Sequence, residues 1–212
     1  MGAEPAAPPK KLVILGASYA ASWGAPTLPG YVVVNRGVGG QQTKDMNARF
    51  QRDVVATRPD AVLIWGHINN ITQSDVRNLT PEGIEAVKAG ARADYVSMLK
   101  QARAAGIDVM LATEVPMAEA IGPMDHARAL LGRLRGKPSY RAIVNAEVRD
   151  LNLFVRQLAA HENLRVLDFE KVFAPDGGAR EPEYATDDHS HITKAGYQAL
   201  TAYTVAELGA RR

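Results

Sequence analysis

Residues 11–24 read KLVILGASYAASWG, and this segment sets the expected architecture. Its first half, Lys11 to Gly16, is almost continuously apolar and rich in Val, Ile and Leu, as is typical of a strand covered on both faces. Small residues and a serine follow at once, where the chain is expected to turn into a helix. A buried strand that leads directly into a helix indicates a parallel α/β sheet.

Four further apolar runs repeat this strand pattern. We expect buried strands at residues 31–35, 61–66, 107–113 and 164–169. Helical patterns lie between them, because apolar residues recur every three or four positions from Thr80-Pro81 to Gly106 and again over residues 140–158. A last helix is expected from Thr193 to about Leu208, while residues 114–139 are expected to be irregular and to shape a pocket.

The composition limits the class of protein. A chain of 212 residues predicts one domain, residues 11–212, after a flexible Ala/Pro-rich leader at residues 1–10. The net charge of +2 is spread along the chain, so we expect neither nucleic acid nor an anionic membrane as a partner. No apolar run reaches the roughly 18 residues that a membrane span needs. Oligomeric state is not predicted.

The chain contains no cysteine, which excludes disulfides, a thiol nucleophile and thiolate metal sites. The first residues carry no hydrophobic signal core. Two locations stay open on this basis: a cytoplasmic protein, or a periplasmic or secreted protein written without its signal.

Polar residues suited to chemistry follow the expected strands, at the sheet edge where ligands of such folds bind. Ser18 follows the first strand, the glycine-rich NRGVGGQQT of residues 35–43 follows the second, and WGHINNI of residues 65–71 follows the third. Each has an ordinary structural explanation as a helix cap or a turn. Phosphate binding is one use for such a loop, but this one is not a P-loop, because no Gly-Lys-Ser/Thr follows and Lys44 comes after Thr43 at the wrong spacing. Nucleotide binding is therefore the last of the alternatives.

Residues 184–200, YATDDHSHITKAGYQAL, place Asp188 three positions before His191. One tight turn then brings a carboxylate to an imidazole, a pair that activates a serine hydroxyl when one is nearby. Ser18 is the candidate nucleophile. The same segment could instead hold a metal ion through Asp187, Asp188, His189 and His191.

Taken together and in this order, the four segments resemble the SGNH (GDSL-type) hydrolase family. GAS resembles its Gly-Asp-Ser block, NRGVGGQQT its glycine block, WGHINN its Gly-x-Asn-Asp block, and DHSHITKAGY its Asp-x-x-His block. The resemblance implies a flavodoxin-like three-layer α/β/α sandwich with a five-stranded parallel sheet. It implies a catalytic triad of Ser18, His191 and Asp188. It also implies an oxyanion hole formed by Ser18, Gly40 and Asn69.

The function implied by the resemblance is hydrolysis of carboxylic esters through an acyl-enzyme, with no metal or organic cofactor. The expected substrate is a small-molecule or carbohydrate ester, with an acetyl or short acyl chain. Five apolar residues are weighed as the lining of an acyl site, although simple packing is the commoner role: Trp23, Trp65, Met117, Ile121 and Met124. His67 is expected to be structural, and His189 to face elsewhere or lie at the rim.

The sequence departs from the family pattern at three aspartates, which are replaced by Ala17, Gln41 and Asn70. The resemblance implies that none of the three replaced aspartates is a nucleophile, a base or an oxyanion donor. The third block also has one residue extra, so Asn69 is the expected donor and Asn70 the alternative. Two other functions stay open: a binding module that has lost the reaction, and a metal-dependent hydrolase that uses the Asp/His cluster.

Overall fold

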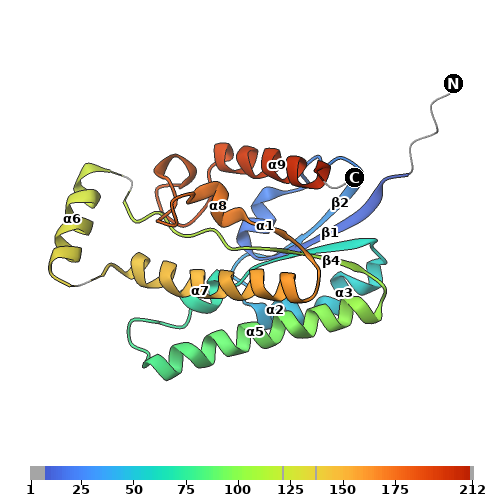
Figure 1. Ribbon diagram of the computed structural model, residues 1–212, viewed down its shortest axis with the longest axis horizontal. Coiled ribbons are helices and arrows are strands. Elements are labelled where there is room, and N and C mark those ends of the chain that lie inside the picture. The colour runs from blue at the N-terminus through green and yellow to red at the C-terminus, as the bar shows by residue number, and fades with distance from the viewer. Residues whose placement is uncertain (1–7, 121, 137, 211–212) are drawn as a thin grey trace.

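The computed structural model of the chain describes residues 8–120, 122–136 and 138–210 (Figure 1). Five parallel strands form one sheet in the order β2-β1-β3-β4-β5. This order is that of flavodoxin-like sheets. The strands are β1 (Lys10–Gly16), β2 (Tyr31–Gly37), β3 (Ala61–Trp65), β4 (Asp108–Ala112) and β5 (Arg165–Leu167). The expected five-stranded parallel fold is therefore confirmed.

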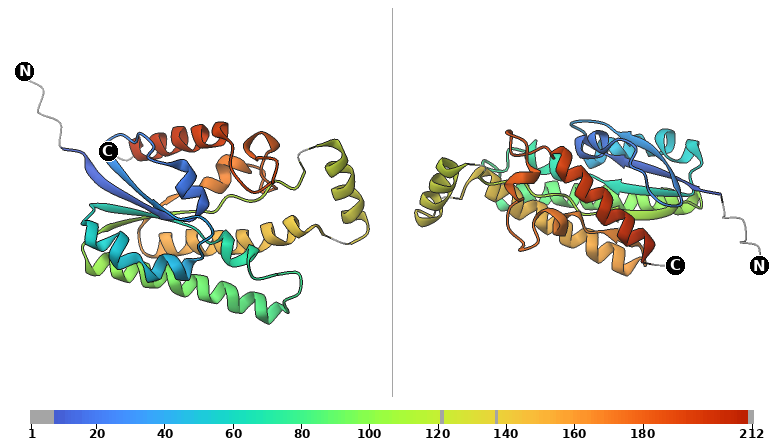
Figure 2. Two further views of the ribbon diagram at one scale, coloured as in Figure 1. Left: turned by 180° about the vertical axis from the view of Figure 1, so that it is seen from behind. Right: turned by 90° about the horizontal axis from the view of Figure 1, so that it is seen from above.

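Helices cover both faces of this sheet, as the front and back views show (Figures 1 and 2). One layer holds α1 (Ser18–Trp23), α8 (Phe169–Phe173) and α9 (Lys194–Gly209). The other holds α2 (Thr43–Ala48), α3 (Phe50–Asp53), α5 (Pro81–Ala104) and α7 (Tyr140–His161). Shorter elements in the connections are α4 (Ile68–Thr72) and the 3-10 turns η1 (Val55–Thr57) and η2 (Pro182–Tyr184).

Alternate residues of β1 explain the two layers. Leu12 and Ile14 belong to the apolar cluster under α1, α8 and α9, while Val13 and Leu15 belong to the cluster under α2, α3 and α5. All four side chains are at most 1% exposed. The strand is covered on both faces, as its near-continuous apolar sequence predicts.

Two long helices begin at the caps that the sequence predicts. The Thr80 hydroxyl accepts a hydrogen bond from Gly83 N at 3.2 Å, and the Thr193 hydroxyl accepts one from Gly196 N, also at 3.2 Å. Strand β5 is shorter than expected, because the chain turns at Asp168 and starts α8 at Phe169.

The segment expected to be irregular contains a helix, α6 (Pro123–Leu134). Pro123 occupies its first position, where a missing N–H costs nothing. The helix stands away from the rest of the fold, at the end toward which the strands point (Figures 1 and 2). Its apolar residues Met124 and Leu134 are exposed.

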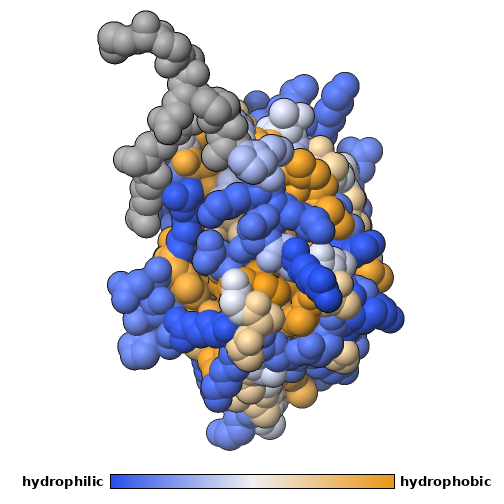
Figure 3. All heavy atoms as spheres, turned by 90° about the vertical axis from the view of Figure 1, so that its right-hand side faces the viewer, coloured by the Kyte–Doolittle hydropathy of each residue, from blue (hydrophilic) through white to orange (hydrophobic). Residues whose placement is uncertain are grey.

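The opposite end of the molecule, where the strands begin, presents apolar residues scattered among hydrophilic ones (Figure 3). Pro8 and Pro9 have no regular structure before β1, and most of the expected leader lies outside the described residues. None of the described helices combines the length and the apolar character that crossing a membrane requires.

Candidate functional site

A cavity of about 310 Å³ lies at the carboxyl ends of the strands. Its walls come from α1, the loop after β2, α4 and the turn before α9. The lining residues are Ser18, Tyr19, Gly39, Gly40, Ile68, Asn69, Thr72, Ser190 and His191. Four of the residues predicted for the site, Ser18, Gly40, Asn69 and His191, therefore meet in one cavity.

Ser18 is placed by the close approach of α1 to the sheet. It is the first residue of α1, directly after β1, and is half-buried. A Cβ added at Gly16 would lie 2.5 Å from the Ala20 Cβ atom of α1, and one at Gly37 would lie 2.2 Å from Ala21 N, also on α1. Glycine at both strand ends thus lets the helix that carries Ser18 pack directly on its neighbours.

The glycine loop after β2 presents backbone to the cavity. Gly40 has a φ of +76°, a conformation that side-chain-bearing residues rarely adopt. Its carbonyl oxygen accepts a hydrogen bond from the Gln73 side chain at 2.7 Å. With its carbonyl fixed on α4's side, the loop keeps a defined orientation beside Ser18.

Asn69 and Asn70 have different surroundings, which bears on the choice between them. The Asn69 amide lines the cavity and donates to the Gln41 carbonyl oxygen at 2.9 Å, so one of its two N–H groups is used there. Asn70 is buried, accepts from Thr43 N at 3.1 Å and donates to the Thr43 hydroxyl at 3.0 Å. Asn70 is engaged in holding α2 and does not line the cavity.

The Glu114 side chain caps the N-terminus of α4, the helix that carries Asn69. The Glu114 carboxylate accepts hydrogen bonds from His67 N at 2.8 Å and Ile68 N at 3.3 Å, at the start of α4. Its other oxygen is buried without a hydrogen-bond partner among the described residues. Burial raises the pKa of Glu114, although these N–H donors and the Arg180 charge act in the opposite direction.

The turn before α9 ties Asp188 to His191. The Asp188 Oδ2 atom lies 2.5 Å from His191 Nδ1, while Oδ1 accepts from the backbone N–H groups of Ser190 and His191 and from the Thr186 hydroxyl, each at 2.8 Å. Partial burial acts to raise the pKa of Asp188. The four hydrogen bonds outweigh it and lower the pKa well below the usual range.

His189 faces away from this pair. It is buried at a φ of +63°, its Nδ1 lies 3.2 Å from the Ala118 carbonyl oxygen, and its Nε2 lies 3.6 Å from Asp125 Oδ2. Across the described residues, no group of three or more His, Cys, Asp or Glu side chains is arranged to hold a metal ion. The clustering of Asp187, Asp188, His189 and His191 in the sequence does not become a ligand set.

The sequence pattern and the fold agree with one family of enzymes. The profile of the GDSL-like Lipase/Acylhydrolase family matches residues 13–199. This chain belongs to that family. It is accordingly an ester hydrolase, and the resemblance seen in its four sequence blocks is confirmed.

Solved structures share the fold of this GDSL-like hydrolase, and a curated protein matches part of its sequence. The crystal structure of a GDSL-like lipase from Bacteroides thetaiotaomicron is 22% identical, with a TM-score of 0.69 over 95% of this chain and 89% of that one. An acetylxylan esterase from Geobacillus stearothermophilus is 20% identical, with a TM-score of 0.67 over 95% of each chain. An uncharacterized lipoprotein of Bacillus subtilis, YqeF, is 32% identical over 90 residues, which cover 42% of this chain and 35% of that protein.

The apolar residues considered for an acyl site lie elsewhere in this hydrolase. Trp65 and Met117 are buried in the core, and Met124 is exposed on α6. Ile121 lies outside the described residues. Trp65, Met117 and Met124 do not line the Ser18 cavity. Its apolar wall is Ile68, which is also the residue that shifted the third block out of register.

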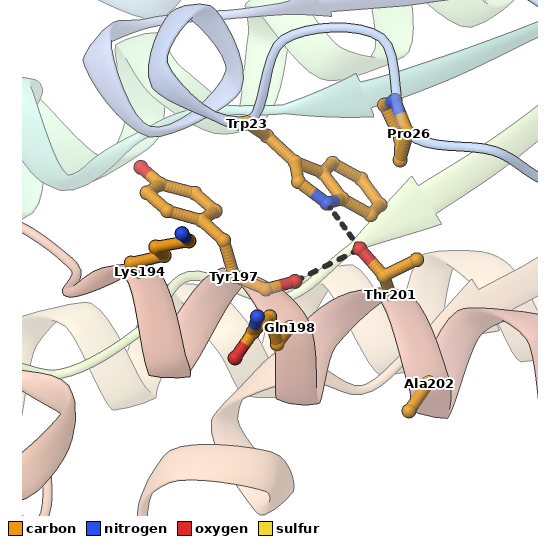
Figure 4. Close-up of a pocket in the computed structure, with 7 residues that line it drawn as sticks. All are labelled: Trp23, Pro26, Lys194, Tyr197, Gln198, Thr201 and Ala202. Carbon is orange, nitrogen blue, oxygen red and sulfur yellow. Dashed lines mark hydrogen bonds between the residues drawn. The ribbon is translucent and has the colours of Figure 1, made fainter.

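Trp23 lines a second hollow of about 440 Å³ between α1 and α9 (Figure 4). Its indole nitrogen donates to the Thr201 hydroxyl at 3.0 Å, and that hydroxyl donates to the Tyr197 carbonyl oxygen at 2.8 Å. Trp23 also packs edge-on against Trp65 and Phe169. It therefore joins α1 to α9 and to the core.

His67 is structural, as expected. It is 1% exposed, and its Nδ1 lies 3.2 Å from the Tyr95 hydroxyl. Burial lowers the pKa of His67 to about 3, so the ring is neutral under ordinary conditions. Two buried residues that support the site, Arg180 and Tyr19, were not predicted, because neither belongs to a recognisable local pattern.

Proposed function

We propose that this hydrolase is a serine esterase that cleaves acetyl or other short-chain esters, with Ser18 as nucleophile, His191 as base and Asp188 as the group that orients the imidazole. One observation carries the proposal: Ser18 and His191 line the same cavity, and the Nδ1 of His191 is 2.5 Å from the Asp188 carboxylate. With Nδ1 bonded to the carboxylate, Nε2 is left to exchange protons with Ser18 and the substrate.

The reaction runs in two halves. The Ser18 hydroxyl attacks the ester carbonyl as His191 takes its proton, and the tetrahedral oxyanion is stabilised by the N–H groups of Ser18 and Gly40 and by the Asn69 amide. His191 returns the proton to the leaving alcohol, and an acyl-enzyme remains. Water, activated by the same histidine, then attacks the acyl carbonyl, releases the acid and restores Ser18.

The preference for a short acyl group rests on the size of the cavity. Its volume of about 310 Å³ falls at the lower end of the range of ligand sites, roughly 300–1,000 Å³. Ile68, Asn69 and Thr72 line it on the α4 side. The alcohol part is proposed to be a carbohydrate, by analogy with structural neighbours that are described as acetylxylan esterases.

The test is the hydrolysis of p-nitrophenyl acetate, butyrate and octanoate by the wild type and by Ser18→Ala, each with and without EDTA. We expect acetate to be the best of the three esters, Ser18→Ala to lose activity by a factor on the order of 10⁵–10⁶, and EDTA to change nothing. Acetylated xylo-oligosaccharide, followed by acetate release, tests the carbohydrate part separately.

Two results would overturn the proposal. Activity that survives Ser18→Ala and disappears with EDTA would assign the reaction to a metal, which then acts without Ser18. No hydrolysis of any ester by the wild type, acetylated oligosaccharide included, would indicate that the fold serves as a binding module.

A further inference from the structure

Arg180 is a buried cation placed between three segments of the site. Its residue is 2% exposed, in the loop between α8 and η2. Its Nε donates to the Pro116 carbonyl oxygen at 2.9 Å, its Nη1 to the His191 carbonyl oxygen at 2.8 Å, and its Nη2 to the Tyr19 hydroxyl at 3.0 Å. One guanidinium thereby joins the loop after β4, the turn of His191 and the helix of Ser18.

Tyr19 completes this connection. Its hydroxyl accepts from Arg180 and donates to the Ser190 carbonyl oxygen at 2.7 Å, and its ring meets the His191 ring edge-on at 6.3 Å between centroids. Tyr19 therefore fixes the carbonyl group of Ser190, and Arg180 fixes that of His191. Because Tyr19 directly follows Ser18 in α1, the contact links the proposed nucleophile to the proposed base across 171 positions of sequence.

The chemistry of the side chain indicates why an arginine stands here. Among the described residues no carboxylate forms a salt bridge with Arg180, and its acceptors are two carbonyl groups and a hydroxyl. Burying such a charge costs several kcal/mol, and an apolar side chain of similar volume would avoid that cost. What only the guanidinium supplies is a planar set of directed donors that reaches three acceptors at once.

We propose that Arg180 and Tyr19 are positioning residues, which set the separation between Ser18 and His191 by fixing the backbone of the His191 turn to α1. The inference rests on the proposed function, because it concerns the alignment of that same serine and histidine. Neither side chain acts on the substrate through its own protons. A shift of about 1 Å in such an alignment costs on the order of 10²-fold in rate.

The experiment compares Arg180→Met, Arg180→Lys and Tyr19→Phe with the wild type in p-nitrophenyl acetate hydrolysis. All are measured at a temperature where circular dichroism shows the variant folded. We expect kcat to fall about 10²-fold in Arg180→Met and about tenfold in Tyr19→Phe, with KM within about twofold of the wild type. Arg180→Lys should fall between, because an ammonium keeps the charge and cannot reach all three acceptors.

A matched control separates alignment from stability. Arg156 on α7 is also well paired, through hydrogen bonds to Asp168 at 2.7 Å and Glu170 at 2.6 Å, and it contacts neither Tyr19 nor the His191 turn. Arg156→Met should lower the melting temperature and leave kcat within about twofold of the wild type.

A further variant, Arg180→Ala, allows chemical rescue. Addition of guanidinium ions at millimolar concentration should raise kcat of Arg180→Ala, and an equal concentration of sodium chloride should not.

Wild-type activity tells the two proposals apart. If the wild type hydrolyses the ester and folded Arg180→Met and Tyr19→Phe match its kcat, the positioning role is wrong while the esterase stands. If the Arg180 variants fail to fold, Tyr19→Phe decides alone, because it keeps the ring and removes only the hydroxyl. If the wild type hydrolyses no ester, the proposed function fails and this inference fails with it.

Discussion

The two sides of the candidate site are held in place by different means. Ser18 follows β1, a strand paired on both sides with β2 and β3, and inherits its position from the middle of the sheet. His191 lies in a turn that belongs to no strand, with one isolated bridge between Ala185 and Ile192 and polar contacts from Asp188 and Arg180. Changes to the residues that support Ser18 should therefore act mainly on stability, and changes to the residues that support His191 mainly on activity.

After the loss expected for Ser18→Ala, Asp188→Asn should have the largest effect. An amide in place of the carboxylate would direct an N–H group at His191 Nδ1 and favour the wrong tautomer, which costs about 10⁴-fold in kcat in comparable triads. Because Asp188 is half exposed, the melting temperature should change little. Steady-state kinetics and thermal unfolding measure the two effects. Asp187→Asn, at the exposed neighbouring aspartate, is the control and should retain activity within about twofold.

The asparagine pair on α4 offers a sharper contrast. Asn69→Ala should lower kcat by about 10²–10³-fold by removing an oxyanion donor. Asn70→Ala should instead destabilise the fold, because it leaves the buried Thr43 N–H without its acceptor and removes one of the two hydrogen bonds of the Thr43 hydroxyl, which still donates to Asp94. Kinetics and denaturant unfolding on both variants check this. The reverse result, with Asn70→Ala the one that loses kcat while folded, would move the donor to Asn70.

Gly40→Ala and Gly39→Ala distinguish the cost of an unfavourable backbone conformation from the cost of a steric clash. An added Cβ meets nothing within 4 Å at either position, but only Gly40 has a positive φ. Gly40→Ala should therefore cost about 1–2 kcal/mol of unfolding free energy, and Gly39→Ala much less. Equilibrium denaturation measures both. Equal costs at the two glycines would mean that the loop relaxes and does not fix the Gly40 N–H.

Glu114→Gln should have the smallest effect. It should change how the stability of the folded protein depends on pH. Since the pKa of Glu114 is raised in the folded state, the folded protein binds more protons than the unfolded one between the ordinary carboxyl pKa and the raised one. The wild type should lose stability as the pH rises through this window, and Gln should remove that loss. Melting temperatures of both proteins from about pH 4 upward test this. Parallel curves would contradict it.

The sequence predicts the sheet side of the site better than the turn side. Short, continuously apolar runs such as Ala61–Trp65 form strands that are buried on both faces. The helix starts at Thr80 and Thr193 are predictable because they depend on local hydrogen bonds. Residues predicted at the strand ends meet because parallel strands end at one edge. Their catalytic roles stay predictions.

The contributions of Arg180 and Tyr19 could not be predicted. Each residue depends on partners that are distant in the sequence. Arg180 and Tyr19, which share a hydrogen bond, are 161 positions apart, and no local spacing indicates such a contact. The role of the apolar residues considered for an acyl site could not be decided from the sequence for a related reason. A tryptophan or methionine suits a core as well as a pocket, and only the packing of Trp65 and Met117 among their neighbours distinguishes the two.

The order in which the chain is made gives the joining of α1 to α9 a further consequence. The last strand of the sheet ends at Leu167, but the turn of His191 and the helix that docks on Trp23 come later, with contacts that span 178 residues. Contacts between such distant segments form late in folding. A nascent chain with its sheet already complete would still lack the proposed base, so α1 and α9 must both leave the ribosome before the proposed hydrolysis can begin.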